Sequence, residues 1–313
     1  MTEWQTRTPV ALIIFNRPST TEKVFAAVRA AKPPKLFLIA DAPRNDRPDD
    51  VAKCAAVRAI VDQVDWDCEV FQNYAETNLG CRVRPSSGLD WVFANTEEAI
   101  ILEDDCLPHP SFFRYCDELL EYYRDNQRIM TICGANLQFG RQRTKDSYYF
   151  SRFNNCWGWA SWRRAWQHFD CDMKLWPQVR DGNWLMDILE DEYSVKVWLD
   201  AFEVTYNGKL VTWDFQWIFS AWLQGGLAVL PNVNLISNIG FAGDGTHTLA
   251  KASEYDNMPL ETLEFPLQHP PFIIRDRQAD LFTQNTYYDY HPGLTKKVKN
   301  KLRRLIKGSL VKQ

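Results

Sequence analysis

Three consecutive carboxylates, Glu103, Asp104 and Asp105, follow the apolar run AIIL and precede a proline-containing turn. Adjacent negative charges repel, and burying them is costly unless a cation or hydrogen bonds compensate. The triplet therefore either lies at a solvated strand end or binds something positive. Hard divalent cations such as Mn²⁺ and Mg²⁺ take oxygen ligands of this kind, and such a cation can neutralise a departing diphosphate.

A general base would have to come from another segment. Asp214 in LVTWDFQWIFSAW is flanked by aromatic residues on both sides, and it is separated from the nearest acids by stretches without carboxylates. Aromatic neighbours desolvate a carboxylate and raise its pKa toward a useful value. The same residue can equally cap the helix that FQWIFSAWL predicts. Asp187 and Asp191 in DGNWLMDILEDE are the alternative bases.

The elements that must position these acids alternate along the first hundred residues. Continuous apolar runs predict buried strands, and capped or amphipathic segments predict helices, the first of them with Ser19 as its cap. This alternation predicts a mainly parallel sheet with helices on both faces, whose ligands bind beyond the carboxyl ends of the strands. Arg17, Asp41 and the triplet all fall at such ends. The strands are expected over 9–16, 35–41, 68–74 and 99–105, and the helices over 19–31, 49–64 and 85–97.

The composition restricts the class of protein. The chain has 313 residues, enough for one large domain, and its net charge of −4 argues against a nucleic-acid partner. None of the eight cysteines stands in a C-x-x-C pair, so we expect reduced thiols and a cytoplasmic protein. The sequence shows no signal peptide, and its apolar runs are too short to span a membrane.

The segment IILEDDCLPHPSFFRYCDELLEYYRDNQRIMTICGAN resembles the metal-site segment of GT-A glycosyltransferases. The likeness is strongest to the N-acetylglucosaminyltransferase I family and to bacterial family 2-like glycosyltransferases, and it extends over roughly residues 8 to 250. It implies a GT-A (Rossmann-like) mixed, mainly parallel sheet flanked by helices. It further implies one domain over 1–290, with a nucleotide-binding half about 8–135 and an acceptor half about 136–255.

The resemblance also implies roles for individual residues. Asp105 would coordinate Mn²⁺ or Mg²⁺, and Asp214 would be the base of an inverting transfer. The loop NNCWGWASW would face a sugar ring, and the glycine-rich SNIGFAGDGTHTL would fold over the nucleotide, with His247 as a second metal contact. The implied nucleotide contacts are Arg17, Asp41, Arg82, Arg84, Glu103 and Asp104, and the implied acceptor or sugar contacts are Trp157, Gly158, Trp159 and Trp213. Arg82 and Arg84 stand where the eukaryotic family has a His-Arg pair.

The function that follows is a metal-dependent hexosyl or N-acetylhexosaminyl transfer. The donor would be a nucleotide-diphosphate sugar of the UDP type and the acceptor a glycan or glycolipid, as in polysaccharide biosynthesis. A sugar-phosphate nucleotidyltransferase is the alternative, although FNRPSTTEK lacks the glycines of its phosphate loop. A non-catalytic carbohydrate-binding protein could use the 13 tryptophans. A phosphatase would need an Asp where Asn16 and Arg17 stand.

The end of the chain differs from the rest. Residues 296–313 contain eight Lys or Arg and no acid, and Leu294, Val298, Leu302 and Leu305 share one helical face. This pattern predicts a basic amphipathic helix over 291–313 that attaches through 294–312 to an anionic membrane surface. A solvated terminus is the other interpretation of the same residues.

Overall fold

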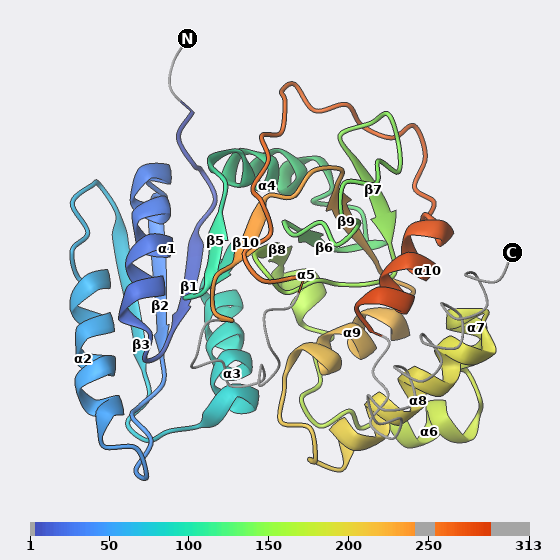
Figure 1. Cartoon of the computed structure of the whole chain (residues 1–313), viewed down its shortest axis with the longest axis horizontal. Coiled ribbons are helices and arrows are strands. Elements are labelled where there is room, and N and C mark those ends of the chain that lie inside the picture. Colours follow the sequence, from blue (N-terminus) through green and yellow to red (C-terminus); the bar gives the residue numbers. More distant parts are fainter. Residues whose placement is uncertain (1–3, 242–253, 289–313) are drawn as a thin grey trace, which may run out of the picture.

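The computed structural model describes residues 4–241 and 254–288 (Figure 1). Within them, eight strands form one sheet in the order β3-β2-β1-β4-β8-β6-β9-β7, and β8 and β7 run antiparallel to their neighbours. The expected mixed, mainly parallel sheet is confirmed. Its strands are β1 (Val10–Ile14), β2 (Lys35–Ala40), β3 (Glu69–Tyr74), β4 (Glu98–Glu103), β6 (Ile129–Cys133), β7 (Tyr148–Ser151), β8 (Trp159–Trp162) and β9 (Leu227–Pro231).

Helices cover both faces of this sheet. In β1, Leu12 and Ile14 join one hydrophobic cluster while Ala11 and Ile13 join another, because successive side chains of a strand point to opposite faces. This is why the strand is apolar throughout. The first face packs on α1 (Pro18–Ala31), α2 (Asp49–Val61) and α4 (Pro110–Tyr122), and the second on α3 (Gly80–Asn95), α5 (Arg163–Trp166) and α9 (Asp214–Leu223).

The first helix begins differently from the expectation. α1 starts at Pro18, its N-cap residue is Arg17, and no side chain caps it. Ser19 therefore does not cap this helix. Proline is well suited to the first helical position, because its missing N–H would have no partner there. The start at Pro18 leaves Arg17 outside the helix, directly after β1.

A second, small sheet brings a distant segment next to the acidic triplet. β5 (Cys106–Pro108) pairs antiparallel with β10 (Ile236–Asn238), so that Cys106 lies opposite Asn238. The two strands are visible side by side in the middle of Figure 1. The pairing continues into the turn, where the Ile239 N–H donates to the Asp105 carbonyl oxygen at 2.8 Å. Residues 236–241 are thereby fixed beside the end of β4.

An aromatic cluster forms the core of a helical lobe beside the sheet. Trp176, Trp198, Phe202 and Trp222 are buried there, with ring centroids 4.7–5.6 Å apart in the pairs they form. The lobe lies at the lower right of Figure 1 and explains much of the tryptophan content as core. It is built from α6 (Trp176–Asp181), α7 (Leu185–Leu189), α8 (Glu192–Tyr206) and the outer side of α9.

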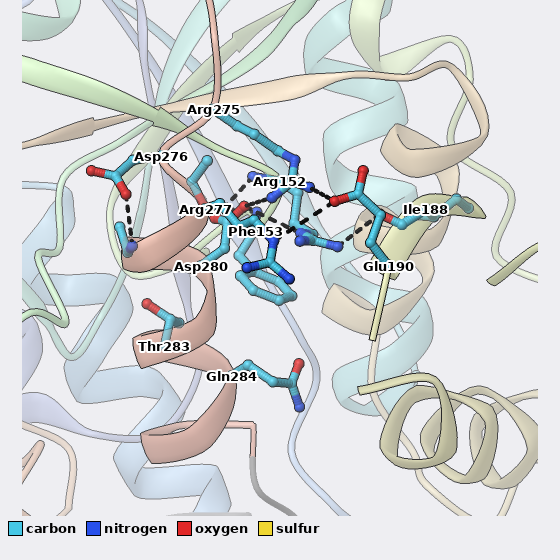
Figure 2. Close-up of polar contacts among 12 residues, drawn as sticks. Arg152, Phe153, Ile188, Glu190, Arg275, Asp276, Arg277, Asp280, Thr283 and Gln284 are labelled. Carbon is cyan, nitrogen blue, oxygen red and sulfur yellow. Dashed lines mark hydrogen bonds and ion pairs between the residues drawn. The ribbon is translucent and has the colours of Figure 1, made fainter. Parts of the chain in front are cut away.

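The last described helix, α10 (Arg277–Thr286), is attached to the sheet by buried charges. Asp280 is 1% exposed and accepts hydrogen bonds from Ser151 Oγ at 2.6 Å, Arg152 Nε at 3.2 Å and Arg275 Nη1 at 3.1 Å. Figure 2 shows how Arg275 also reaches Glu190, 2.7 Å away at the end of α7. One carboxylate therefore joins α10 to β7 and, through Arg275, to the helical lobe.

None of the helices within the described ranges combines the length and the apolar character that a membrane crossing requires. The predicted tail helix over 291–313, with Leu294, Val298, Leu302 and Leu305, lies outside the described residues. The same holds for His247 and for the glycines of the 242–253 segment.

We expect Asp280→Ala to lower the free energy of unfolding by about 3–5 kcal/mol, because it leaves the buried Arg152 without its counter-charge. Glu190→Gln is the matched control. Its side chain is 54% exposed, so we expect a loss of only about 0–1 kcal/mol. Urea unfolding of both variants measures the difference, and equal losses would contradict the anchoring role of Asp280.

Candidate active site

The acidic triplet lies at the end of β4 and is mostly buried. Glu103 is the last residue of the strand and is half-buried, whereas Asp104 and Asp105 are 6% and 8% exposed. Asp104 Oδ2 accepts a hydrogen bond from the Phe15 N–H at 2.9 Å. This geometry favours the ligand-binding interpretation of the triplet over a solvated loop, because buried carboxylates need positive partners.

Arg17 is one such partner. Its Nη1 atom lies 2.5 Å from Asp105 Oδ2 and 3.7 Å from Asp104 Oδ1. The contact follows from the sheet, because β1 and β4 are parallel neighbours with Ile13 opposite Glu103. Burial disfavours the guanidinium charge, but Asp105 and Asp104 outweigh this effect and raise the pKa of Arg17. The predicted meeting of Arg17 with the triplet is thus observed.

One arginine does not neutralise the whole cluster. Burial, and then the charge of Asp105, raise the pKa of Glu103 to about 8 and that of Asp104 to about 7. Arg17 lowers both values only in part. The cluster therefore keeps negative charge that Arg17 does not fully compensate, which is the electrostatic condition for binding a cation.

Gly240 borders the same carboxylate. A Cβ atom built on Gly240 would lie 2.2 Å from Asp105 Oδ2, closer than any side chain can approach. Gly240 also donates its N–H to Asn238 Oδ1 at 2.9 Å, which fixes its position after β10. The absence of a side chain at position 240 therefore gives Asp105 the space that it occupies.

Asp41, expected to contact the nucleotide base, is engaged within the protein. Its carboxylate accepts hydrogen bonds from the N–H groups of Ala42, Leu79 and Gly80 at 2.8–2.9 Å and from Asn78 Nδ2 at 3.2 Å. It thereby caps the N-terminus of α3 from the end of β2. A base would have to compete with these donors. The cap also accounts for the start of α3 at Gly80, five residues before the expected one.

The two arginines of α3 bind to neighbouring segments. Arg82 Nη2 donates to the Cys171 carbonyl oxygen at 2.9 Å and to Asp172 Oδ1 at 3.2 Å. Arg84 is buried and donates to the carbonyl and side-chain oxygens of Asn73 at 3.0 and 2.7 Å. Burial lowers the pKa of Arg84. Arg82 thus links α3 to the segment after α5, and Arg84 links it to β3, while their expected phosphate contacts remain predictions.

Asp214 comes from the other half of the chain and approaches the triplet. It is the first residue of α9, and its Oδ1 atom accepts hydrogen bonds from the Phe215 N–H at 3.0 Å and from Thr212 Oγ1. Both bonds use Oδ1, and neither involves Oδ2. The carboxylate lies close enough to raise the pKa of Glu103.

The thiol of Cys81 is influenced by carboxylates from three different segments. Burial raises the pKa of its thiol, and the charges of Asp214, Glu103 and Asp41 raise it further. The thiol also donates to the Val211 carbonyl oxygen at 3.2 Å, linking the start of α3 to the segment before α9. Charges that follow β2, end β4 and begin α9 therefore all act on this one thiol.

The alternative bases belong to the helical lobe. Asp191 caps α8, where it accepts hydrogen bonds from the Ser194 N–H at 2.8 Å and from Ser194 Oγ at 2.6 Å, and these bonds lower its pKa. Asp187 lies in the short helix α7. Of the three acids, Asp214 is the one whose charge acts on Glu103.

The expected acceptor residues divide into two groups. Trp159 is fully buried and packs 5.9 Å from Trp213, which is 5% exposed, so both rings belong to the core and lack the open face that sugar stacking requires. Trp157 is half-buried and keeps an exposed surface. Gly158 has φ = +58°, and a Cβ atom there would lie 2.3 Å from Ile236. Gly158 thus allows the chain to turn between Trp157 and Trp159.

Tyr287, which the sequence did not indicate, contacts the site from the end of α10. Its ring stands edge-on to Trp157, 5.7 Å away, and Trp157 stands edge-on to Phe241 at 5.8 Å. Burial, and then Asp214, raise the pKa of the Tyr287 phenol. We call Trp157, Phe241 and Tyr287 the aromatic wall. No local motif marks Tyr287, because its position depends on the docking of α10.

The site offers two adjacent carboxylates to a divalent cation. Within residues 4–241 and 254–288, no group of three His, Cys, Asp or Glu side chains is arranged to hold a metal. Mg²⁺, however, is commonly bound by one or two carboxylates together with substrate phosphates. Asp104 and Asp105 match this pattern, since they are adjacent, buried and only partly compensated by Arg17. The residues fit a cation that arrives with a diphosphate.

No family model matches the sequence, and no curated protein matches it. Among solved structures, the chain is similar to the mannosyltransferase PcManGT from Pyrobaculum calidifontis in complex with GDP-Man and Mn²⁺, with a TM-score of 0.37 and 14% identity. That match covers 54% of this chain and 49% of the mannosyltransferase, so the chain spans about half the length of that protein.

Two further structures are similar at comparable levels. One is 4-diphosphocytidyl-2C-methyl-D-erythritol synthase from Anaerococcus prevotii, with a TM-score of 0.31, 12% identity, and coverage of 50% of this chain and 71% of that one. The other is UDP-glucose pyrophosphorylase complexed with UDP-glucose, with a TM-score of 0.35, 8% identity, and coverage of 74% and 93%. Because these scores lie below 0.5, the proposals that follow rest on the geometry of the site.

The raised pKa of Glu103 predicts a pH dependence of stability in metal-free buffer. Its pKa rises from an ordinary value of 4.5 to about 8, so the folded protein binds more protons than the unfolded chain between these values. Stability therefore falls as pH rises through this window. Over this pH range, we expect the free energy of unfolding of Glu103→Gln to fall by on the order of 1–2 kcal/mol less than that of the wild type.

The measurement is the free energy of unfolding at pH 5 and pH 8 with a chelator present. Glu22→Gln, an exposed position on α1, is the control and should follow the wild type. A wild type that loses no more stability between pH 5 and pH 8 than Glu103→Gln does would contradict the assignment.

Proposed function

We propose that the protein is a metal-dependent, inverting glycosyltransferase that uses a nucleotide-diphosphate sugar. The observation that supports this proposal most is that a buried pair of carboxylates lies near a separate carboxylate from another segment. Asp104 and Asp105 are buried at the end of β4 beside Arg17, and Asp214, from the other half of the chain, lies near enough for its charge to act on the neighbouring Glu103. Such an arrangement offers one site for a diphosphate and another for proton removal.

The diphosphate end of the donor would lie at Arg17, Asp104 and Asp105. A guanidinium group suits phosphate oxygens because its N–H groups match them in pairs. A bound Mn²⁺ or Mg²⁺ would supply the positive charge that stabilises the leaving diphosphate. The N-terminus of α1, which begins directly after Arg17, adds a favourable field for the anion.

Asp214 would act as the base. The acceptor hydroxyl attacks the anomeric carbon, the bond from that carbon to the diphosphate oxygen breaks, and the nucleoside diphosphate leaves with the electron pair. The proton of the hydroxyl passes to Asp214 Oδ2. The hydrogen bonds that hold Oδ1 fix the carboxylate in place for this transfer.

The aromatic wall would bind the sugar of the donor or acceptor. Trp157 and Tyr287 have half-buried rings in edge-on contact, and the charge of Asp214 acts on Tyr287. Such rings pack against the apolar face of a sugar. We propose a UDP-sugar as donor and a glycan or glycolipid as acceptor. A nucleotidyltransferase would instead need a glycine-rich phosphate loop after β1, and FNRPSTTEK has no glycine.

Nucleotide binding tests the proposal directly. We expect one of UDP, GDP and CDP, each at about 100 times its dissociation constant, to stabilise the protein by about 2.7 kcal/mol when Mn²⁺ is present. Asp105→Ala should lose this stabilisation, whereas Asp65→Ala, at a 66% exposed side chain, should keep it. Thermal unfolding gives the readout. Stabilisation only by a nucleoside triphosphate with a sugar phosphate would favour the nucleotidyltransferase.

The role of Asp214 has its own test. We expect Asp214→Asn to bind the donor as the wild type does and to lose transfer by a factor of about 10²–10⁴. Asp187→Asn is the matched control and should retain activity. The assay is release of nucleoside diphosphate from a panel of nucleotide sugars, with binding followed separately by calorimetry. An Asp214→Asn enzyme with wild-type turnover would refute the assignment.

A further inference from the structure

The acidic site contains a positive charge supplied by the protein itself. Arg17 Nη1 lies 2.5 Å from Asp105 Oδ2, and this same oxygen is bordered on another side by Gly240. Asp105 Oδ1 lies 3.5 Å from the Cys106 thiol. The best-placed oxygen of Asp105 is therefore already used by the guanidinium group and enclosed by backbone.

A free divalent cation would have to compete with this ion pair. Two cations beside the same carboxylate repel each other, and the repulsion is strong where water is largely excluded. Asp104 does not offer an independent site, because its Oδ2 accepts from the Phe15 N–H and its Oδ1 lies 3.7 Å from Arg17. As long as Arg17 stays in place, its guanidinium group occupies the position beside both carboxylates that a cation would take.

The side chain of Arg17 can leave without unfolding its surroundings. Its backbone is held by the hydroxyl groups of Thr20 and Thr21 and by the Thr21 N–H, which all donate to the Arg17 carbonyl oxygen at 2.7–3.2 Å. The guanidinium contacts described are those with Asp104 and Asp105. The side chain is 20% exposed, so it borders solvent on one side. The guanidinium group can therefore leave Asp105 for another anion by a change of side-chain rotamer, without a shift of α1.

We propose that Arg17 is an exchangeable counter-ion that keeps divalent cations out of the acidic site until a diphosphate is present. A diphosphate gives the guanidinium a new, doubly charged partner and frees Asp105 for the cation. The cation and the diphosphate then bind together, each raising the affinity of the other. This inference rests on the proposed function, since it takes a nucleoside diphosphate as the ligand.

The test is a titration of metal-free protein with Mn²⁺, followed by the loss of the electron paramagnetic resonance signal of the free ion. Wild type should bind Mn²⁺ alone weakly, and UDP or GDP should raise its affinity by about tenfold or more, a typical coupling between linked sites. Arg17→Gln should bind Mn²⁺ alone about tenfold more tightly than wild type, and the nucleotide should add little. Arg17→Lys keeps the charge and should resemble wild type.

Arg44→Gln is the matched control. Arg44 Nε lies 2.6 Å from Asp50, whose side chain is 2% exposed, so this variant also removes an arginine from a buried carboxylate. Asp50 has no adjacent acid in the sequence other than the exposed Asp49, and we expect no gain in Mn²⁺ binding. Thermal unfolding in a chelator shows whether each variant is folded. If Arg17→Gln is not folded, the proposal is judged by how much the nucleotide raises the Mn²⁺ affinity of wild type and of Arg17→Lys.

The outcomes separate this inference from the proposed function. Equal binding of Mn²⁺ alone by wild type and Arg17→Gln, with wild type still stabilised by a nucleoside diphosphate, would overturn the counter-ion role and leave the function intact. If no diphosphate changes Mn²⁺ binding to wild type, the coupling is overturned. If, in addition, no diphosphate stabilises wild type, the proposed function fails with it.

Discussion

Two adjacent carboxylates buried at the end of a parallel strand set the main physical constraint on this protein. Asp104 and Asp105 would repel each other and lose their hydration if the fold gave them no partners. The sheet supplies these partners, because β1 lies next to β4 and ends at the same edge. Phe15 contributes a backbone donor and Arg17 a positive charge. The order of the central strands is thus a condition for the acids to be buried.

The second half of the chain closes the site from the opposite side. β10 pairs with β5 and places Gly240 against Asp105, and α9 presents Asp214 toward Glu103. α10 adds Tyr287 through the buried contacts of Asp280. These segments share no sequence motif with the triplet. They meet it because antiparallel strands and buried ion pairs return the chain to the carboxyl edge of the sheet.

The parts of the fold that the sequence predicted are those set by local patterns. A strand covered on both faces is apolar throughout, so β1, β2 and β4 were located together with the polar residues that follow them. Asp41 was placed correctly at the end of β2, but its bonds to Leu79 and Gly80 join residues nearly forty positions apart. The early start of α3 depends on that distant cap, and residue propensity alone does not indicate it.

The aromatic residues show the same division between local and distant causes. Trp157 and Trp159 are two positions apart, yet only Trp157 is partly exposed, because Trp159 begins β8 and faces the core. The pattern predicted aromatic side chains near the site without distinguishing surface from interior. Tyr287 depends on the attachment of α10 to Ser151 and Arg152, about 130 residues away. Such a contact is set by tertiary packing alone.

The docking of α10 also affects the order in which the protein can be completed during synthesis. The ribosome delivers the N-terminal part of a chain before the C-terminal part. The Arg17–Asp105 pair can form once β4 has emerged, whereas Tyr287 is among the last residues of the described chain. A nascent or prematurely terminated polypeptide would therefore contain the acidic centre without its aromatic wall. A chain that stopped after β9 would lack Phe241 and Tyr287, two of the three residues of the aromatic wall.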